Sequence, residues 1–233
     1  MIPWHSIDTV LLDMDGTLLD LHFDNYFWLH FLPERYAQTH QVDLATAKDR
    51  LHAHYEAHQG TLNWYCLKFW GESLQMEIRP LKEEVKHLIQ IRPFAVEFLQ
   101  RLQQHGKRLV LITNAHPESL DLKLEVTNID HWLDMVISSH QLQYPKEEQA
   151  FWHNLQQREQ FNPDRTLFID DSPRILQSAV DYGLRFVLGI RHPDSQQPPR
   201  DLAPFPAIDH FDELLPTLPI IENAGMSKPP SNG

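Results

Sequence analysis

Five short apolar runs recur along the chain, and segments with helical spacing of apolar positions separate most of them. The runs are Val10–Leu12, Leu109–Ile112, Met135–Ile137, Leu167–Ile169 and Phe186–Leu188. Strands that are apolar throughout are typical of a parallel sheet whose two faces are both covered. The pattern therefore predicts five buried parallel strands.

The segments between the later runs have the period of amphipathic helices. These segments are Phe94–Gln104, Glu118–Val126, Glu147–Arg158 and Pro173–Tyr182. Gly106 and Gly183 follow two of them, where glycine commonly ends a helix. Strand and helix alternate, which indicates an α/β protein with a doubly wound parallel sheet.

The segment between the first two predicted strands breaks this alternation, because it contains no strand pattern. Its helical patterns are Asn25–Tyr36, Asp43–His58, Leu62–Leu74 and Leu81–Ile89, with Pro33, Gly60 and Pro80 near the breaks. An unstructured loop of this length would be exceptional in a compact domain. We therefore predict an all-helical subdomain over residues 21–90, inserted into a core of residues 1–20 and 91–220.

The C-terminal part of the chain becomes rich in proline and glutamine after Arg191. His210–Leu215 has the pattern of one short closing helix. Residues 221–233 combine small and polar residues with two prolines, and we expect them to form a disordered tail.

Composition narrows the function classes. The 233 residues carry 32 acids and 20 bases, a net charge of −12 that argues against a nucleic-acid polymer as partner. The single cysteine, Cys66, permits no intrachain disulfide, which is typical of a reducing compartment. No apolar run is long enough to span a membrane, so we expect a cytoplasmic protein without a membrane partner. The sequence does not indicate its oligomeric state.

Fifteen histidines raise the question of a metal site. They are scattered, and His52, His54 and His58 lie in a polar helical stretch without a neighbouring cysteine. Such histidines are interpreted as surface or core residues rather than as metal ligands.

Polar residues follow the predicted strands at four places. Asp13 and Asp15 come directly after the first strand, and Thr113-Asn114 ends the second. The remaining members are Lys146, which follows the third strand, and Asp170-Asp171, which ends the fourth. Because ligands of open parallel sheets bind beyond the carboxyl ends of the strands, we expect these residues to share one site.

Several carboxylates in one place repel each other unless a cation compensates them. A hard divalent ion with oxygen ligands, Mg²⁺ above all, suits such a site. Asp13 could then attack phosphorus and form an aspartyl-phosphate. We expect the neighbouring carboxylates to raise the pKa of Asp15, which would let it act first as acid and then as base.

The strings "DMDGT", "LITN", "YPK" and "FIDDS" resemble, in this order, the four motifs of the haloacid dehalogenase-like hydrolase superfamily. The resemblance implies a Rossmann-like core with a helical cap after the first strand. It implies Asp13 as nucleophile, Asp15 as acid/base, Thr113 as phosphate ligand, and Lys146 as the group that steadies nucleophile and phosphate.

The resemblance also implies which groups would hold Mg²⁺. They are the carboxylate of Asp13, the main-chain carbonyl of Asp15, and one acid of the pair Asp170 and Asp171. Asp171 aligns with the acid of the commoner Gly-Asp-Ser version of this motif. Asp170 replaces the glycine and could bind through water, so the sequence leaves both acids as candidates.

A closer similarity involves "FDNYFW", "TLNWYC" and "TNAHP", which resemble bacterial nucleotidases of this superfamily that act on the purine monophosphates GMP and IMP. The partner would then be a small phosphorylated metabolite. Asn63 and Trp64 are candidates for binding the base, since a purine needs a stacking face and hydrogen-bond partners. Packing within the cap is the alternative for Trp64.

Other functions stay open at the level of sequence. A phosphomutase of this fold would need basic cap residues, and Arg50, Lys68 and Arg79 are available. A phosphatase for sugar phosphates or phosphoglycolate has the same core requirements. A non-catalytic sensor of a phosphorylated metabolite is a further alternative, which the complete set of polar residues at the strand ends disfavours.

Overall fold

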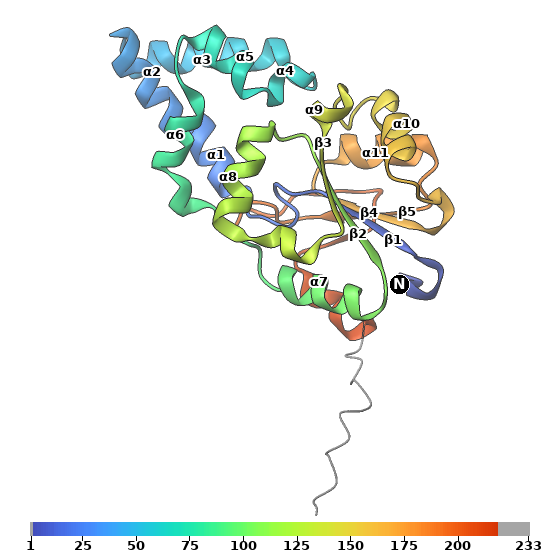
Figure 1. The fold of residues 1–233 in the computed structure, drawn as a ribbon. Coiled ribbons are helices and arrows are strands. Elements are labelled where there is room, and N and C mark those ends of the chain that lie inside the picture. The colour runs from blue at the N-terminus through green and yellow to red at the C-terminus, as the bar shows by residue number, and fades with distance from the viewer. Residues whose placement is uncertain (1, 219–233) are drawn as a thin grey trace, which may run out of the picture.

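The structure is a computed structural model that describes residues 2–218. One six-stranded sheet has the order β3-β2-β1-β4-β5-β6, and all its strand pairs are parallel (Figure 1). The strands are β1 (Thr9–Leu12), β2 (Arg108–Thr113), β3 (Met135–Ser138), β4 (Thr166–Asp170), β5 (Phe186–Ile190) and β6 (Ala207–Ile208). The predicted α/β fold is confirmed, and β6 is a short strand that the sequence pattern did not reveal.

The sheet separates two hydrophobic cores. Leu109 and Leu111 of β2 belong to the core that includes α7, whereas Val110 and Ile112 belong to the core that includes α10 and α11. The helices after β1 and the insertion are α7 (Ala95–Gln104), α8 (Pro117–Thr127), α9 (Ser139–Leu142), α10 (Gln149–Arg158) and α11 (Pro173–Tyr182). Alternating side chains of one strand thus bury both faces, which explains the uninterrupted apolar runs.

The strand order places a topological switch point at β1. β1 pairs with β2 on one side and with β4 on the other, so the connections diverge there. The carboxyl ends of β1 and β4 are adjacent, with Leu12 beside Ile169 in the register. A crevice at such a point is the usual ligand site of an open parallel sheet.

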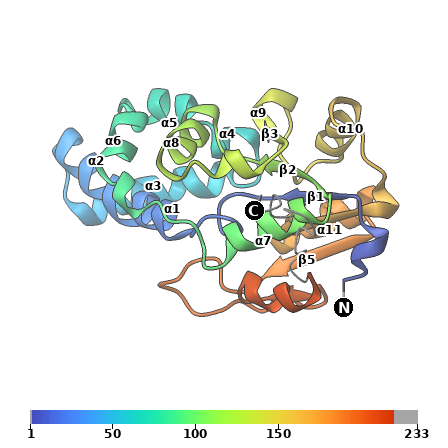
Figure 2. The same ribbon diagram turned by 60° about the horizontal axis from the view of Figure 1, so that its bottom comes forward.

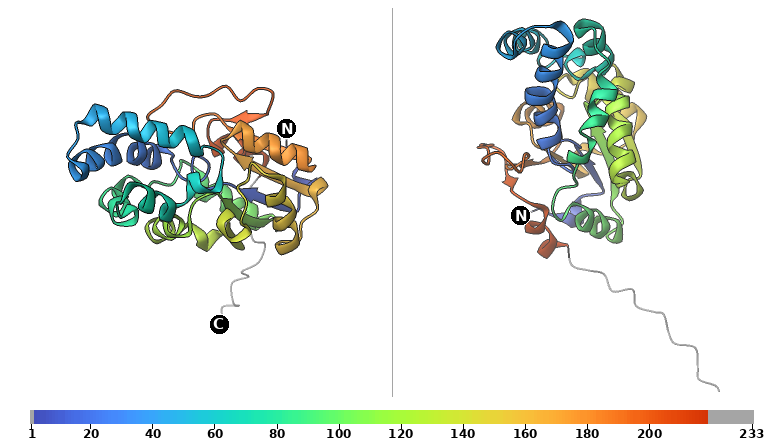
Figure 3. Two further views of the ribbon diagram at one scale, coloured as in Figure 1. Left: turned by 90° about the horizontal axis from the view of Figure 1, so that it is seen from above. Right: turned by 90° about the vertical axis from the view of Figure 1, so that its left-hand side faces the viewer.

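Residues 21–90, between β1 and α7, are helical, as predicted, and gather to one side of the sheet (Figures 1 and 3). Their helices are α1 (His22–Tyr26), η2 (Phe27–Phe31), α2 (Leu32–His40), α3 (Leu44–His58), α4 (Leu62–Tyr65), α5 (Leu67–Leu74), α6 (Ile78–Glu84) and η3 (Lys86–Leu88). We call residues 21–90 the helical insertion. Its treatment as a separate cap domain stays a prediction.

Two breaks within the insertion differ from the sequence pattern. Pro33 does not end a helix, because α1, a π-helical turn (η2) and α2 follow each other without interruption. A proline removes one helical hydrogen bond and crowds the preceding turn, and a wider π turn accommodates both effects. The predicted helix Leu62–Leu74 is instead divided at Cys66, whose extended backbone and sulfur cap the start of α5.

Two short connections join the insertion to the sheet, and they run side by side. The Asp20 N–H donates to the carbonyl of Gln90 at 2.9 Å, and the Arg92 N–H donates to the carbonyl of Leu18 at 2.9 Å. Leu19 and Ile91 form an isolated antiparallel bridge between them. These hydrogen bonds fix where the insertion leaves and re-enters the core.

The segment after β6 returns to the face that α7 covers (Figure 2). Phe211 stacks on Phe98 of α7 with ring centroids 4.7 Å apart. The expected helix His210–Leu215 is two 3-10 turns, η6 (Phe211–Glu213) and η7 (Leu215–Thr217). The predicted disordered tail, residues 221–233, lies outside the described residues. Over residues 2–218, no helix combines the length and apolar character needed to cross a membrane.

Candidate active site

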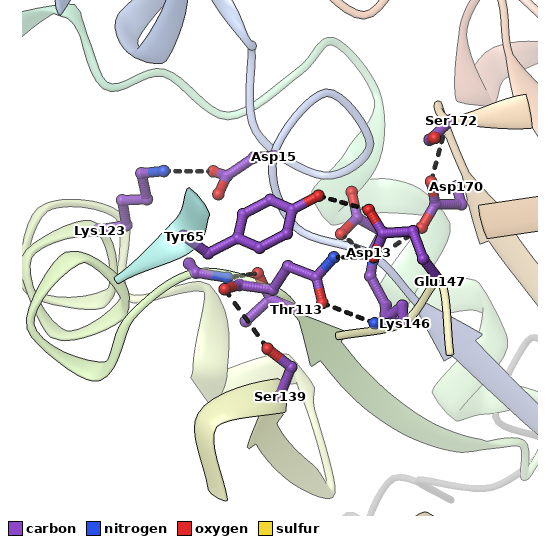
Figure 4. A network of polar contacts seen from close by, with 12 residues as sticks. Asp13, Asp15, Tyr65, Thr113, Lys123, Ser139, Lys146, Glu147, Asp170 and Ser172 are labelled. Atoms are coloured by element: carbon purple, nitrogen blue, oxygen red, sulfur yellow. Dashed lines mark hydrogen bonds and ion pairs between the residues drawn. The ribbon is translucent and has the colours of Figure 1, made fainter. Parts of the chain in front are cut away.

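Lys146 joins the ends of β1 and β4 (Figure 4). Its buried Nζ donates to Asp13 Oδ1 at 2.5 Å and to Asp170 Oδ2 at 2.7 Å. Its main-chain N–H donates to Asn114 Oδ1 at 2.9 Å, which attaches it to the end of β2. Burial alone lowers the pKa of Lys146, but the two carboxylates outweigh it, so the net pKa is raised and the ammonium form persists.

Asp13, Asp170 and Asp171 bring their carboxylate oxygens within 4.8 Å of one another. Burial raises the pKa of Asp13 to about 6, and the charge of Asp170 adds to the shift. Burial also raises the pKa of Asp170 to about 6. Burial and the charge of Asp13 together raise the pKa of Asp171 to about 7. The three oxygens form a donor set that could hold a hard divalent cation.

The two adjacent acids differ in their remaining capacity. Asp170 uses both oxygens, because Oδ2 accepts from Lys146 and Oδ1 accepts from the Ser172 N–H at 2.8 Å. Asp171 accepts one bond, from the half-exposed Arg200 at 3.2 Å. The open lone pairs therefore lie mainly on Asp171.

Asp15 belongs to a different set of contacts. Lys123 of α8 donates to Asp15 Oδ1 at 2.6 Å and to Asp24 Oδ2 at 2.6 Å. Lys82 of α6 donates to the other oxygen of Asp24 at 2.8 Å. A buried chain of alternating charges, Asp15–Lys123–Asp24–Lys82, thus links the loop after β1 to the helical insertion.

This chain sets the ionisation of its members. Burial raises the pKa of Asp15 to about 6. The charges of Asp24 and Asp13 also raise this pKa, whereas Lys123 lowers it without cancelling the rise. Burial would also raise the pKa of Asp24, but Lys123 and Lys82 outweigh it and lower the pKa to about 2. Asp15 therefore exchanges a proton near neutral pH, whereas Asp24 stays ionised.

The end of β2 contributes a hydroxyl and an amide. The Thr113 hydroxyl accepts from the Ala115 N–H at 3.0 Å and is almost fully buried. Asn114 Nδ2 donates to Glu147 at 2.9 Å, and Tyr65 of the insertion donates to the other oxygen of Glu147 at 2.7 Å (Figure 4). Glu147, next to Lys146 in sequence, therefore connects the sheet to the insertion.

These groups line one cavity of about 300 Å³ between the sheet and the insertion. Its charged lining comprises Asp13, Asp15, Asp24, Asp170, Asp171, Lys82, Lys123 and Lys146, and its aromatic lining comprises Trp28, Tyr55, Trp64, Tyr65 and Trp70. Thr113 and Asn114 also line it, so the residues expected at the strand ends do meet. Trp64 lines the cavity, whereas Asn63 is exposed and lies outside the lining.

Gly16 fixes how closely the first and fourth motifs approach. Its φ of +86° is a left-handed conformation, and a Cβ there would lie 2.8 Å from Asp171 Cγ. A side chain at this position would strain the turn and displace the carboxylate. The glycine therefore lets the loop after β1 pack directly on Asp171.

Sequence reasoning missed Lys123 and Lys82, whereas Asp24 belongs to the string "FDNYFW" that it did single out. Asp24 lies just after the loop that carries Asp13 and Asp15. The two lysines lie in helices whose local sequence pattern does not distinguish them from surface lysines. Only burial sets them apart: Lys82 and Lys123 are each 1% exposed. A buried lysine must have partners, and these can be found only after the helices are placed.

Comparison with known proteins agrees with this geometry. A family model described as haloacid dehalogenase-like hydrolase matches residues 7–183. The chain belongs to the haloacid dehalogenase-like hydrolase family. This hydrolase is also 42% identical over 217 residues to the GMP/IMP nucleotidase YrfG of Escherichia coli K12, covering 93% of this chain and 98% of the relative. The predicted family, the enzymatic character and the resemblance to a bacterial nucleotidase are thereby confirmed.

Solved structures of the same family share the fold of this hydrolase. A HAD phosphatase from Thermococcus onnurineus superposes with a TM-score of 0.73 at 21% identity, covering 89% of this chain and 96% of that one. The putative HAD-hydrolase YfnB from Bacillus subtilis, described as bound to magnesium, superposes with a TM-score of 0.62 at 18% identity, covering 92% and 99%. At these identities the likeness concerns the fold alone.

Replacing Lys123 with methionine tests the buried chain of charges. The change removes the buried cation between the half-buried Asp15 and Asp24, of which only Asp24 keeps a lysine partner, and loss of one partner from a buried ion pair typically costs about 3–5 kcal/mol. We expect a loss of this size in the free energy of unfolding, measured by urea denaturation. Glu125→Gln, on an exposed position of α8, is the control and should change stability little. Equal stability of both variants would contradict the assigned role of Lys123.

Proposed function

We propose that this hydrolase is a Mg²⁺-dependent phosphomonoester hydrolase that works through an aspartyl-phosphate on Asp13, with a purine nucleoside 5′-monophosphate as substrate. The observation that carries the proposal is the separate environments of two carboxylates in one cavity. Burial raises the pKa of both carboxylates to about 6, so their partners distinguish them: Asp13 accepts from Lys146, which also donates to Asp170, whereas Asp15 accepts from Lys123. Lys146 and a bound cation would keep Asp13 ionised as the nucleophile, while Asp15, held apart by Lys123, would carry the proton.

The proposed reaction has two steps. An oxygen of Asp13 forms a bond to phosphorus while the bond from phosphorus to the ester oxygen breaks, and Asp15 gives its proton to that oxygen. A water molecule then gives a proton to Asp15 and attacks the phosphorus of the aspartyl-phosphate. Inorganic phosphate leaves and Asp13 is regenerated. Lys146 orients Asp13 throughout and offsets part of the charge of the phosphate, and Thr113 is the proposed hydroxyl ligand of the phosphate.

The donor set supports Mg²⁺ as the cofactor. Its atoms are carboxylate oxygens, which Mg²⁺ prefers, and the carboxylates that line the cavity outnumber the lysines. We propose that Asp13, Asp171 and the main-chain carbonyl of Asp15 hold the ion, while Asp170, whose two oxygens are already engaged, orients Lys146. The bound ion would neutralise phosphate charge and polarise the phosphoryl group.

The aromatic part of the cavity supports a substrate with a planar base. Trp64 and Tyr55 lie edge to face with centroids 5.6 Å apart, and both line the cavity together with Trp28. A purine could stack on such a surface while its phosphate occupies the charged end. The 42% identical relative is named a GMP/IMP nucleotidase, which favours a purine monophosphate over sugar phosphates or phosphoglycolate.

The basic residues considered for a phosphomutase lie elsewhere. Arg50 and Lys68 are exposed, and Arg79 pairs with Glu83 and Glu125 at the surface of the insertion. None of the three lines the cavity. Lys82 is a basic residue of the insertion that does line the cavity, but its ammonium group is engaged by Asp24.

A panel of phosphate monoesters tests the reaction and the substrate class. We expect phosphate release from GMP and IMP with Mg²⁺, less from ribose 5-phosphate, glucose 1-phosphate and phosphoglycolate, and none above background in EDTA. Asp13→Asn should lower kcat at least about a thousandfold, as loss of a covalent nucleophile does in other enzymes. Asp49→Asn, on an exposed position of α3, is the matched control. Turnover that persists in EDTA or in Asp13→Asn would refute the mechanism. Absence of turnover with every ester would favour the non-catalytic sensor of a phosphorylated metabolite.

The raised carboxyl pKa values predict how Mg²⁺ stabilises the protein at different pH. Asp13 and Asp170, with pKa values of about 6, and Asp171, with a pKa of about 7, retain protons in acid. Because Mg²⁺ competes with these protons, the rise in Tm that it causes should be small at about pH 5 and large at about pH 8. The difference between Tm with Mg²⁺ and Tm with EDTA at the same pH removes the effects of pH on stability that do not depend on Mg²⁺.

Asp171→Asn is the variant for this measurement, and it should lose most of the Mg²⁺-dependent rise at the higher pH. A rise that is independent of pH, or that persists fully in Asp171→Asn, would show that the ion binds elsewhere.

Trp64→Leu tests recognition of the base. Stacking of a base on an aromatic ring contributes about 1–3 kcal/mol, so kcat/KM for GMP should fall roughly 5- to 150-fold. Ribose 5-phosphate lacks a base, and its kcat/KM should change little. Trp132→Leu, at a half-buried tryptophan of the 3-10 turn η4 (Ile129–Trp132) outside the cavity, is the control. An equal loss for both substrates would mean that Trp64 only packs the insertion. Asn63→Ala, assayed alongside, tests the prediction that this amide contacts the base.

A further inference from the structure

Three potential metal ligands meet at the boundary between the helical insertion and the sheet. Cys66, His116 and His140 bring one ligand atom each within 4.8 Å of one another. All three side chains are half-buried. They form a different ligand group from the carboxylates of the proposed Mg²⁺ site, although His116 also lines the cavity, and the proposed hydrolysis does not use them.

The fold brings the two histidines together through the pairing of β2 and β3. Thr113 lies beside Ser138 in the register, and His116 and His140 follow within three residues of these strand ends. The Ser138 hydroxyl donates to the carbonyl of Ala115 at 2.7 Å and ties the two loops. The imidazole rings consequently lie edge to face with centroids 5.0 Å apart.

Cys66 enters from the insertion. It stands at the break between α4 and α5, and its sulfur accepts the Phe69 N–H at 3.4 Å. The neighbouring Tyr65 donates to Glu147 at 2.7 Å, which holds this break against the rim of the sheet. The position of the sulfur is therefore determined by contacts on both sides of the boundary.

The histidines have ligand-competent atoms. His140 Nε2 is buried and has no hydrogen-bond partner within residues 2–218, which is unfavourable unless another group occupies that position. His116 Nδ1 carries the lone pair of the neutral ring where it accepts the Glu118 N–H, and this contact is long, at 3.4 Å, so ligation through Nδ1 would replace it at little cost.

We propose that Cys66, His116 and His140 form a second metal site, distinct from the carboxylates, that binds a thiolate- and imidazole-preferring ion of the Zn²⁺ class. One sulfur and two nitrogen ligands match the preference of Zn²⁺ and exclude Mg²⁺, which prefers oxygen. Three protein ligands leave a fourth position for water or another ligand. Because the ligands come from both parts of the chain, the bound ion ties the insertion to the rim of the sheet.

Co²⁺ substitution tests the site directly. Cys66 is the single cysteine of the chain, so a sulfur-to-cobalt charge-transfer band can arise from this residue alone. The reduced protein is titrated with Co²⁺ while excess Mg²⁺ saturates the carboxylates. We expect the band to grow to one equivalent of Co²⁺ and to disappear when Zn²⁺ is added. Absence of the band from the wild-type protein would overturn the proposal, whatever its enzymatic activity.

Variants distinguish a built site from adventitious binding to the thiol. Cys66→Ser should abolish the band, and His140→Gln should raise the Kd for Co²⁺ at least about tenfold, since even outer-shell changes cost that much in known sites. His153→Gln, at an exposed histidine of α10, is the matched control and should bind as the wild type does. Thermal unfolding without metal shows whether each variant is folded. An unchanged Kd in folded His140→Gln would refute the three-residue site.

Discussion

The ion triad Asp13–Lys146–Asp170 is the interaction on which the site depends. Two carboxylates end adjacent strands at the switch point of the sheet, and they would repel each other in this buried position. The ammonium group between them, with both distances at or below 2.7 Å, removes that repulsion. A buried ion pair is stable only when its hydrogen bonds are satisfied, and the Ser172 N–H donates to the second oxygen of Asp170, while Asn114 holds the main chain of Lys146 in place. The triad thus fixes β1, β4 and the loop after β3 relative to each other.

The second set of charges gives the helical insertion a direct connection to the chemistry. Lys123 lies on α8, Asp24 on α1 and Lys82 on α6, so a displacement of the insertion would alter the partners of Asp15. Glu147 makes a similar connection between Lys146 and Tyr65. The sheet and the helical insertion are thereby coupled electrostatically around the cavity.

The cavity combines two kinds of lining. Carboxylates and lysines suit a phosphate with a hard cation, and the aromatic side chains suit a planar base. The thiolate and imidazole ligands of Cys66, His116 and His140 are a third environment beside it, with a preference for a different class of ion. Separation by ligand type allows two ions to bind one molecule without competing.

The sequence by itself determined the parallel α/β core and the residues at its rim. Apolar runs covered on both faces and polar residues at their carboxyl ends are local features, and the geometry of parallel sheets converts their order into proximity. Asp13, Thr113, Lys146 and Asp171 were predictable for this reason. The break at Cys66 was not, because a helical period continues across it and the choice depends on contacts with the sheet.

Only the tertiary structure decided which distant groups became partners. Lys123 and Asp15 are 108 positions apart, and nothing in the sequence near either residue indicates the pair. The same holds for Cys66 with His116 and His140, which the scattered distribution of histidines concealed. Burial selects such partners, since a charge or an imidazole removed from water must find a complementary group, and the fold alone determines which groups are within reach.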